Sequence, residues 1–271
     1  MTWRLLLSPP ASGAWNMAVD EAILRAVACD EAPPTLRLYA WSPPCLSLGY
    51  SQPWEDVDVT RLRARQWDVV RRPTGGRAIL HTDELTYALI APTHHPLMHG
   101  GVLPSYRRIA RGLLAALRLL GLDAQLEGEH PPSPQAKPVC FEVPSSYEIT
   151  VQGRKILGSA QARSAGAVLQ HGTLPLWGDI ARVAEVLHFP DEAARGQAQA
   201  QIRSRATTVS ECLGREVTWQ QAAQAFQAGF EEALGLEFTF GVLSEGEYAT
   251  AVTLRERKYA APSWTQKRQL R

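Results

Sequence analysis

The order of strand-like and helix-like segments constrains the fold of this chain more than any other feature of its sequence. Short apolar or alternating runs, which are typical of strands, follow one another across turns that contain glycine, proline or serine. Helical patterns are inserted between some of these runs and become frequent toward the C-terminus, so a strict strand–helix alternation is absent. We therefore expect an α+β fold with a mixed, largely antiparallel sheet and packed helices.

Periodicity and local stop signals predict the individual elements. Strands are expected at residues 2–7, 35–41, 45–50, 67–70, 78–81, 84–92, 146–151, 154–163 and 168–176. Helices are expected at residues 13–28, 57–66, 105–120, 191–203, 218–234 and 244–259, and the last two begin with capping-box patterns. The apolar stripe of the first helix leaves out Asp20 and Glu21. Residues 127–138 carry several prolines, which predicts an exposed, mobile loop.

Composition and charge narrow the class of protein. The 271 residues are 45% hydrophobic and 20% charged, which is ordinary for a globular chain. No apolar run approaches the ~18–20 residues of a membrane span, and the opening MTWRLLL is too short for a signal peptide. We therefore expect a cytoplasmic protein that does not enter membranes. The 28 basic and 27 acidic residues give a net charge of +1, which argues against nucleic-acid binding.

Neither the cysteines nor the histidines indicate a metal site. Cysteines occur at positions 29, 45, 140 and 212, too far apart for a zinc knuckle, and in a reducing compartment we expect free thiols. The histidine-rich stretch 94–99 contains a proline, which disfavours a regular helix that would place two imidazoles on one face. It contains no acidic residue, and we predict no metal site.

The first candidate for chemistry is the loop 71–77, Arg-Arg-Pro-Thr-Gly-Gly-Arg, followed by His81. Adjacent glycines let a backbone approach a ligand closely, and their amides can point inward. The flanking arginines can hold a phosphate or a carboxylate. A hairpin turn with solvated charges is the alternative interpretation.

Two further candidates lie around the expected hairpin at residues 146–163. Cys140 precedes it and could be an exposed nucleophile, although packing between two apolar neighbours would also explain the residue. Lys155 lies on the second strand, and the small residues 158–160 after it leave room for a ligand against the sheet. A lysine on a hairpin surface is the alternative. Residues 170–172, Gln-His-Gly, supply donors on the next strand, where a lone histidine can equally be structural.

Taken together and in this order, the segments resemble the superfamily of lipoate–protein ligases and octanoyltransferases, which shares its fold with biotin ligases. Residues 16–21, Asn-Met-Ala-x-Asp-Glu, resemble the first helix of that family, and residues 71–87 resemble its acyl-binding loop and strand. Residues 153–163 resemble its lysine strand. The resemblance implies a catalytic domain over residues 1–240, with a C-terminal helical extension over residues 241–271 packed on it.

Two details are similar to the LipM-type branch of octanoyltransferases. Gly-Gly-Arg at 75–77 replaces the three glycines of ATP-dependent ligases, and residues 140–145 reproduce a Cys-Phe-x-x-Pro-Ser context. The resemblance implies that Cys140 is the nucleophile and that Lys155 is the site lysine, acting either as a base or as a cation. It also implies substrate binding by Arg72, Thr74, Gly75, Gly76, Arg77, His81, Ser159, Gln161, Gln170, His171 and Gly172.

The reaction implied by the resemblance is octanoyl transfer in lipoate biosynthesis, through a cysteine thioester and without a cofactor. Octanoyl-acyl carrier protein is the expected donor, and a lipoyl-domain protein such as the glycine cleavage H protein is the expected acceptor. Three alternatives remain at this stage: an ATP-dependent lipoate ligase, an amidotransferase between lipoyl domains, and a lipoyl-domain-binding module without catalysis.

Overall fold

A mixed sheet of eight strands dominates the residues described by the computed structural model, which are 2–128, 148–164 and 166–267. Its strands, in spatial order, are β11 (Phe238–Phe240), β1 (Trp3–Leu7), β2 (Thr35–Tyr39), β6 (Glu84–Pro92), β10 (Ala167–Pro175), β9 (Arg154–Ser164), β8 (Ile149–Val151) and β7 (Ala124–Leu126). Strand β1 pairs in parallel with both of its neighbours, whereas the other pairings in this sheet are antiparallel. The expected α+β fold with a largely antiparallel sheet is confirmed.

A second, three-stranded sheet lies beside the first. Strand β3 (Cys45–Leu48) is central, parallel to β4 (Asp68–Arg71) and antiparallel to β5 (Ile79–His81). The loop between β4 and β5 contains the Gly-Gly turn. Around this sheet pack the helical segments η1 (Trp54–Asp56), α2 (Val59–Ala64), η2 (Ile180–Val186) and α4 (Glu192–Arg205). Helices α2 and α4 confirm the helices expected at 57–66 and 191–203.

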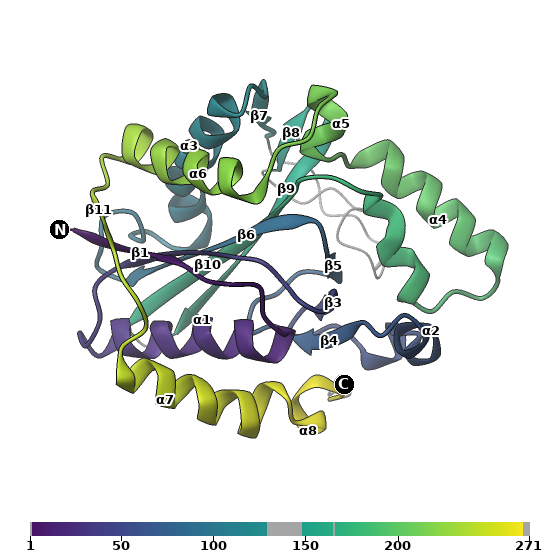
Figure 1. Cartoon of the computed structure of the whole chain (residues 1–271), viewed down its shortest axis with the longest axis horizontal. Coiled ribbons are helices and arrows are strands. Elements are labelled where there is room, and N and C mark those ends of the chain that lie inside the picture. The colour runs from purple at the N-terminus through teal and green to yellow at the C-terminus, as the bar shows by residue number, and fades with distance from the viewer. Residues whose placement is uncertain (1, 129–147, 165, 268–271) are drawn as a thin grey trace.

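Helices cover both faces of the larger sheet (Figure 1). On one face α3 (Val102–Leu119) packs against α6 (Trp219–Leu234), with α5 (Val209–Leu213) nearby. On the other face lies α1 (Gly13–Ala28), with α7 (Glu245–Leu254) against it. The expected start of α3 at Ser105 is wrong, because the helix begins three residues earlier and the Ser105 hydroxyl donates to the carbonyl of Gly101.

The first helix has the expected bounds, but its buried surface is wider than the apolar stripe. Asp20 and Glu21, which that stripe leaves out, are both buried. Each has a cationic partner: Arg37 on β2 for Asp20 and Lys258 for Glu21. A carboxylate enters a protein interior when a cation and hydrogen bonds compensate its lost hydration. The helix is therefore buried on a polar side as well as on an apolar one.

The C-terminal segment runs back along α1 to the Gly-Gly loop. Both expected capping boxes, at Thr218 and at Ser244, are present. After α7 the chain continues as the π-helical turn η3 (Arg255–Tyr259) and the short helix α8 (Pro262–Thr265). Trp264 Nε1 donates to the carbonyl of Arg71, 2.9 Å away, so this segment packs against the start of the loop. No helix among the described residues is long and apolar enough to cross a membrane.

Candidate active site

A cavity lies where α1, the larger sheet and the smaller sheet meet. Met17, Trp41, Ile79 and Ala160 supply apolar surface, and the polar groups of the wall belong to Arg72 and to residues of β2, β3, β5, β6, β9 and β10. This mixture of apolar walls and a few polar groups suits a ligand with an apolar body and one reactive end.

A bulge in β9 places Lys155 beside Gly158, one of the residues that line this cavity. Ile149 on β8 pairs with Leu157, and the next residue, Thr150, pairs with Lys155, so one extra residue is accommodated on β9. A bulge reverses the alternation of side chains along a strand. Lys155 therefore reaches the face of Gly158: a Cβ built on that glycine would lie 3.8 Å from Lys155 Cε. Lys155 is buried and its Nζ donates to Glu148 Oε1, 2.7 Å away, which overturns the surface-lysine alternative.

Two glycines shape the cavity in different ways. At Gly172 a Cβ would lie 2.4 Å from the carbonyl oxygen of Gly158 and 2.7 Å from Tyr87 Cε1, so no side chain fits there. At Gly158 a Cβ would make only ordinary contacts, the nearest at 3.8 Å. Gly172 thus allows β9 and β10 to pack, whereas Gly158 keeps space open beside Lys155.

The loop expected to bind substrate is braced by its own arginines. Arg72 is buried, and its guanidinium donates to the carbonyls of Ser47, Gly75 and Arg77 at 2.8–3.0 Å. Arg71 is also buried and donates to the carbonyls of Gly49 (2.8 Å) and Thr265 (3.0 Å). The fork of five donors on a guanidinium suits this bracing of backbone carbonyls. These arginines fix the loop, and Arg72 in addition lines the cavity.

Gly76 has a positive φ of 90°, which favours glycine. Its carbonyl oxygen would lie 1.9 Å from a Cβ on Gly49, so two glycines are needed where the loop crosses the end of β3. Gly75 and Gly76 are exposed, Arg77 is half-buried, and none of these three lines the cavity. Their role in substrate binding stays a prediction.

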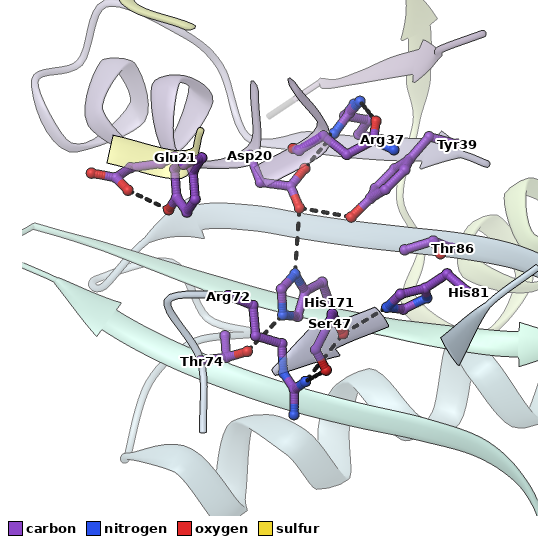
Figure 2. Close-up of polar contacts among 12 residues, drawn as sticks. Asp20, Glu21, Arg37, Tyr39, Ser47, Arg72, Thr74, His81, Thr86 and His171 are labelled. Carbon is purple, nitrogen blue, oxygen red and sulfur yellow. Dashed lines mark hydrogen bonds and ion pairs between the residues drawn. The ribbon is translucent and has the colours of Figure 1, made fainter. Parts of the chain in front are cut away.

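Thr74 and His171 belong to a buried polar chain that starts at Asp20 (Figure 2). Arg37 Nη1 donates to Asp20 Oδ1 at 2.6 Å, and the Tyr39 hydroxyl donates to Asp20 Oδ2 at 2.8 Å. His171 Nδ1 lies 3.4 Å from the same Oδ2, and His171 Nε2 lies 2.7 Å from Thr74 Oγ1. The chain thus links α1, two strands of the larger sheet and the Gly-Gly loop.

The protonation states in this chain follow from burial and from charge. Burial lowers the pKa of His171, although Asp20 opposes this shift. Burial raises the pKa of Asp20, but the Arg37 guanidinium and the hydrogen bond from His171 outweigh it and leave that pKa lowered. At neutral pH we therefore expect an Asp20 carboxylate and a neutral His171. A neutral ring protonated on Nδ1 donates to Asp20 and accepts the Thr74 hydroxyl proton at Nε2.

His81, which also lines the cavity, lies in a second polar group with Ser47 (Figure 2). Its Nδ1 is 2.6 Å from Glu84 Oε1 and its Nε2 is 2.7 Å from Ser47 Oγ. The ring stacks on Trp41, with 3.9 Å between the ring centroids and 9° between the planes. Both ring nitrogens and one face are thus occupied, so His81 forms a rigid part of the wall.

Three residues expected to bind substrate form a network centred on Tyr87 instead. The Tyr87 hydroxyl lies 2.8 Å from Ser159 Oγ, and Gln170 Nε2 donates to the Tyr87 hydroxyl at 3.0 Å. Gln161 Nε2 donates to Gln170 Oε1 at 3.0 Å. Of these residues only Ser159 lines the cavity. Gln161 and Gln170 do not line the cavity, and their expected role in substrate binding stays a prediction.

Sequence reasoning missed Asp20, Arg37, Tyr39 and Thr173 as residues of the cavity or its polar support. One signal for Arg37 is available in the sequence, because a charged residue in the apolar strand TLRLY needs a buried partner. The choice of Asp20 as that partner depends on a contact across 17 residues, which no local pattern specifies.

The expected nucleophile Cys140 and most of the loop 127–138 lie outside the described residues. The described cysteines do not replace Cys140. Cys45 is fully buried, and burial raises the pKa of its thiol, which disfavours the reactive thiolate. Cys29 is exposed at the end of α1, Cys212 contacts Thr207, and neither lines the cavity.

Comparison with known protein families identifies the class of protein to which this chain belongs. The family model of the lipoyl protein ligase A/B catalytic domain matches residues 12–231. The chain belongs to this family. Solved structures agree: a bipartite lipoate protein ligase from Thermoplasma acidophilum superposes with a TM-score of 0.82 at 26% identity, covering 100% of this chain and 98% of that one. A lipoate-protein ligase A bound with ATP gives a TM-score of 0.80 at 26% identity, covering 98% and 99%.

Curated relatives specify the branch. Octanoyltransferase LipM of Symbiobacterium thermophilum is 43% identical, and the match covers 98% of both chains. Octanoyltransferase LipM of Bacillus subtilis (strain 168) is 39% identical over 98% of this chain and 99% of the relative. With identity of this extent over the full length, this chain is an acyltransferase enzyme of the LipM branch.

Proposed function

We propose that this chain is an octanoyltransferase of lipoate biosynthesis that moves the octanoyl group from octanoyl-acyl carrier protein to the lysine of a lipoyl domain. The observation that carries the proposal is the largely apolar cavity, one of whose lining residues, Gly158, lies beside the buried Lys155. An octanoyl tail gains about 0.8 kcal/mol for each buried methylene, so a fitted cavity contributes roughly 4–5 kcal/mol. Its reactive thioester would then lie beside the lysine.

The proposed nucleophile is Cys140. Its thiolate sulfur adds to the thioester carbonyl carbon, and the carbonyl electron pair moves to the oxygen. As the pair returns, the bond to the carrier sulfur breaks, and that sulfur leaves and takes a proton. The amine of the acceptor lysine then attacks the enzyme thioester and loses a proton, an amide forms, and the cysteine is regenerated. A thioester is converted to an amide, so the second step is downhill and requires no ATP.

Lys155 acts in this scheme as a cation rather than as a base. Its Nζ lies 2.7 Å from Glu148 Oε1, which holds the side chain as one half of an ion pair. An ammonium near a thiol favours the thiolate, and it also stabilises the negative charge that develops on the carbonyl oxygen. The test is Lys155→Met, which keeps the length and removes the charge. It should shift the pH dependence of thiol alkylation at Cys140 to higher pH.

Donor and acceptor are tested by comparing substrates on one enzyme preparation. Octanoyl-acyl carrier protein, octanoyl-H protein, and octanoate with ATP are each offered with an unmodified lipoyl domain, and the octanoylated domain is measured by mass. The proposal expects the first donor to be used fastest, without ATP. Use of octanoyl-H protein alone would identify an amidotransferase. A strict need for ATP, with formation of an acyl adenylate, would identify a ligase like the structural relatives.

A further inference from the structure

One polar group in the cavity wall is left unpaired by the residues that the structure describes. Thr173 lies on β10, lines the cavity and is 1% exposed. Among the described residues its hydroxyl has no hydrogen-bond partner. Buried hydroxyls are almost always paired, because leaving one unpaired costs stability. An unpaired hydroxyl in the wall of a binding cavity is therefore a candidate for pairing with the ligand.

Thr86, the neighbour of Thr173 across the sheet, has a hydroxyl that is paired within the protein. Thr86 on β6 is directly opposite Thr173 and also lines the cavity. Its hydroxyl donates to Glu84 Oε1 at 2.6 Å and accepts from Trp41 Nε1 at 2.8 Å. Two threonines thus occupy paired positions in one wall, and of the two only the hydroxyl of Thr86 is hydrogen-bonded to another described residue.

On its other side Thr173 pairs with Gly158 of β9. That glycine leaves open the space between Thr173 and the Lys155 side chain, whose Cε would be 3.8 Å from a Cβ at residue 158. A hydroxyl donor and an ammonium-bearing side chain therefore both lie beside Gly158.

An octanoyl thioester has one oxygen, the carbonyl, and its remaining tail offers no hydrogen-bonding group. We propose that the Thr173 hydroxyl donates a hydrogen bond to this carbonyl oxygen, beside Lys155, and stabilises the negative charge that forms when the thiolate adds. The hydroxyl keeps its proton throughout, so Thr173 binds the developing oxyanion and exchanges no atoms. This inference rests on the proposed octanoyl transfer and deepens it by naming an oxyanion-binding residue.

The test compares Thr173→Val, which removes the hydroxyl at constant shape, with Thr173→Ser, which retains it. Acylation by octanoyl-acyl carrier protein is followed by rapid quenching and intact mass. Loss of one oxyanion donor typically lowers the rate constant about 10²–10³-fold. We expect such a loss in Thr173→Val with little change in half-saturating donor concentration, and near-parent rates in Thr173→Ser. If the valine variant folds poorly, Thr173→Ala tests the same hydroxyl.

The outcomes separate this inference from the proposal on which it rests. Parent and Thr173→Val enzymes that acylate equally fast would overturn the role of Thr173 and leave octanoyl transfer intact. A higher half-saturating concentration with an unchanged rate constant would also overturn it, because the hydroxyl would then serve ground-state binding. A parent enzyme that forms no adduct would overturn the proposed function itself.

Discussion

Replacing Asp20 by asparagine isolates the charge that holds the buried polar chain together. The substitution keeps the shape of the side chain and removes its negative charge. Arg37 is 1% exposed and would then be a buried cation without its carboxylate. Removal of one partner of a buried ion pair costs about 3–5 kcal/mol. Arg37 keeps bonds to Asn16 Oδ1 (2.8 Å) and Ser8 Oγ (3.0 Å), so we expect about 3 kcal/mol, the lower end of that range.

The assay is urea unfolding at pH 7, compared with a matched surface variant. Glu232→Gln removes a carboxylate whose partner is Arg118, and these side chains are 54% and 66% exposed. An exposed pair of this kind is worth about 0–1 kcal/mol. We expect the midpoint of Asp20→Asn to fall by several times the fall of Glu232→Gln. The slope of the free energy of unfolding against urea should be unchanged in both.

A double variant tests the physical cause. Asp20→Asn with Arg37→Met removes both charges from the interior, and burying an apolar side chain in place of a charge is often neutral or stabilising. The double variant should therefore be more stable than Asp20→Asn alone. Equal losses of stability in Asp20→Asn and Glu232→Gln would refute the argument that the buried ion pair stabilises the fold. A double variant whose loss equals the sum of the losses of Asp20→Asn and Arg37→Met would refute it as well.

Two further predictions concern the cavity and its histidine. Gly158→Ala should fold normally because its methyl meets no atom closer than 3.8 Å, but it should slow acylation by octanoyl-acyl carrier protein about 10-fold or more, because the methyl occupies space proposed for the thioester beside Lys155. Gly172→Ala, whose methyl would lie 2.4 Å from a carbonyl oxygen, should lose about 1–3 kcal/mol of stability in the same unfolding assay. An unchanged acylation rate in Gly158→Ala would contradict the placement of the thioester beside Gly158. Burial lowers the pKa of His171 in the folded chain. Below about pH 6.5 the unfolded chain therefore binds a proton on this histidine more readily than the folded chain does, and the free energy of unfolding should fall as the pH decreases. Between pH 7 and 5.5 this fall should be smaller in His171→Gln than in the parent, and equal pH slopes would show that His171 does not carry it.

Local features of the chain were predictable from sequence because local chemistry determines them. The capping boxes at Thr218 and Ser244 are present, since each involves groups only three residues apart. The hairpin of β8 and β9 turns at Gln152 and Gly153, which both have positive φ. The hydrophobic pattern likewise predicted the α+β class, because successive hairpins with a few inserted helices are typical of a largely antiparallel sheet with helices packed on it.

Features that depend on distant contacts were not predictable in the same way. The parallel pairing of β1 with β11 joins residues that are more than 200 positions apart. The bulge that brings Lys155 beside Gly158 depends on the pairing with β8, and the sequence around it has the pattern of an ordinary strand. The sequence pattern left Asp20 outside the apolar stripe of its helix because the residue is charged. An amphipathic pattern cannot show that a buried arginine on another element, Arg37, pairs with it.

The central claim is that Cys140 carries the octanoyl group between donor and acceptor. Purified protein is incubated with octanoyl-acyl carrier protein, without ATP, and its intact mass is measured beside Cys140→Ala and the control Cys29→Ala, which removes an exposed thiol distant from the cavity lining. The account predicts one octanoyl adduct, labile to hydroxylamine, on the parent and on Cys29→Ala, absent from Cys140→Ala and discharged by a lipoyl domain. An adduct that persists in Cys140→Ala, or a parent that transfers octanoyl without ever forming one, would contradict it.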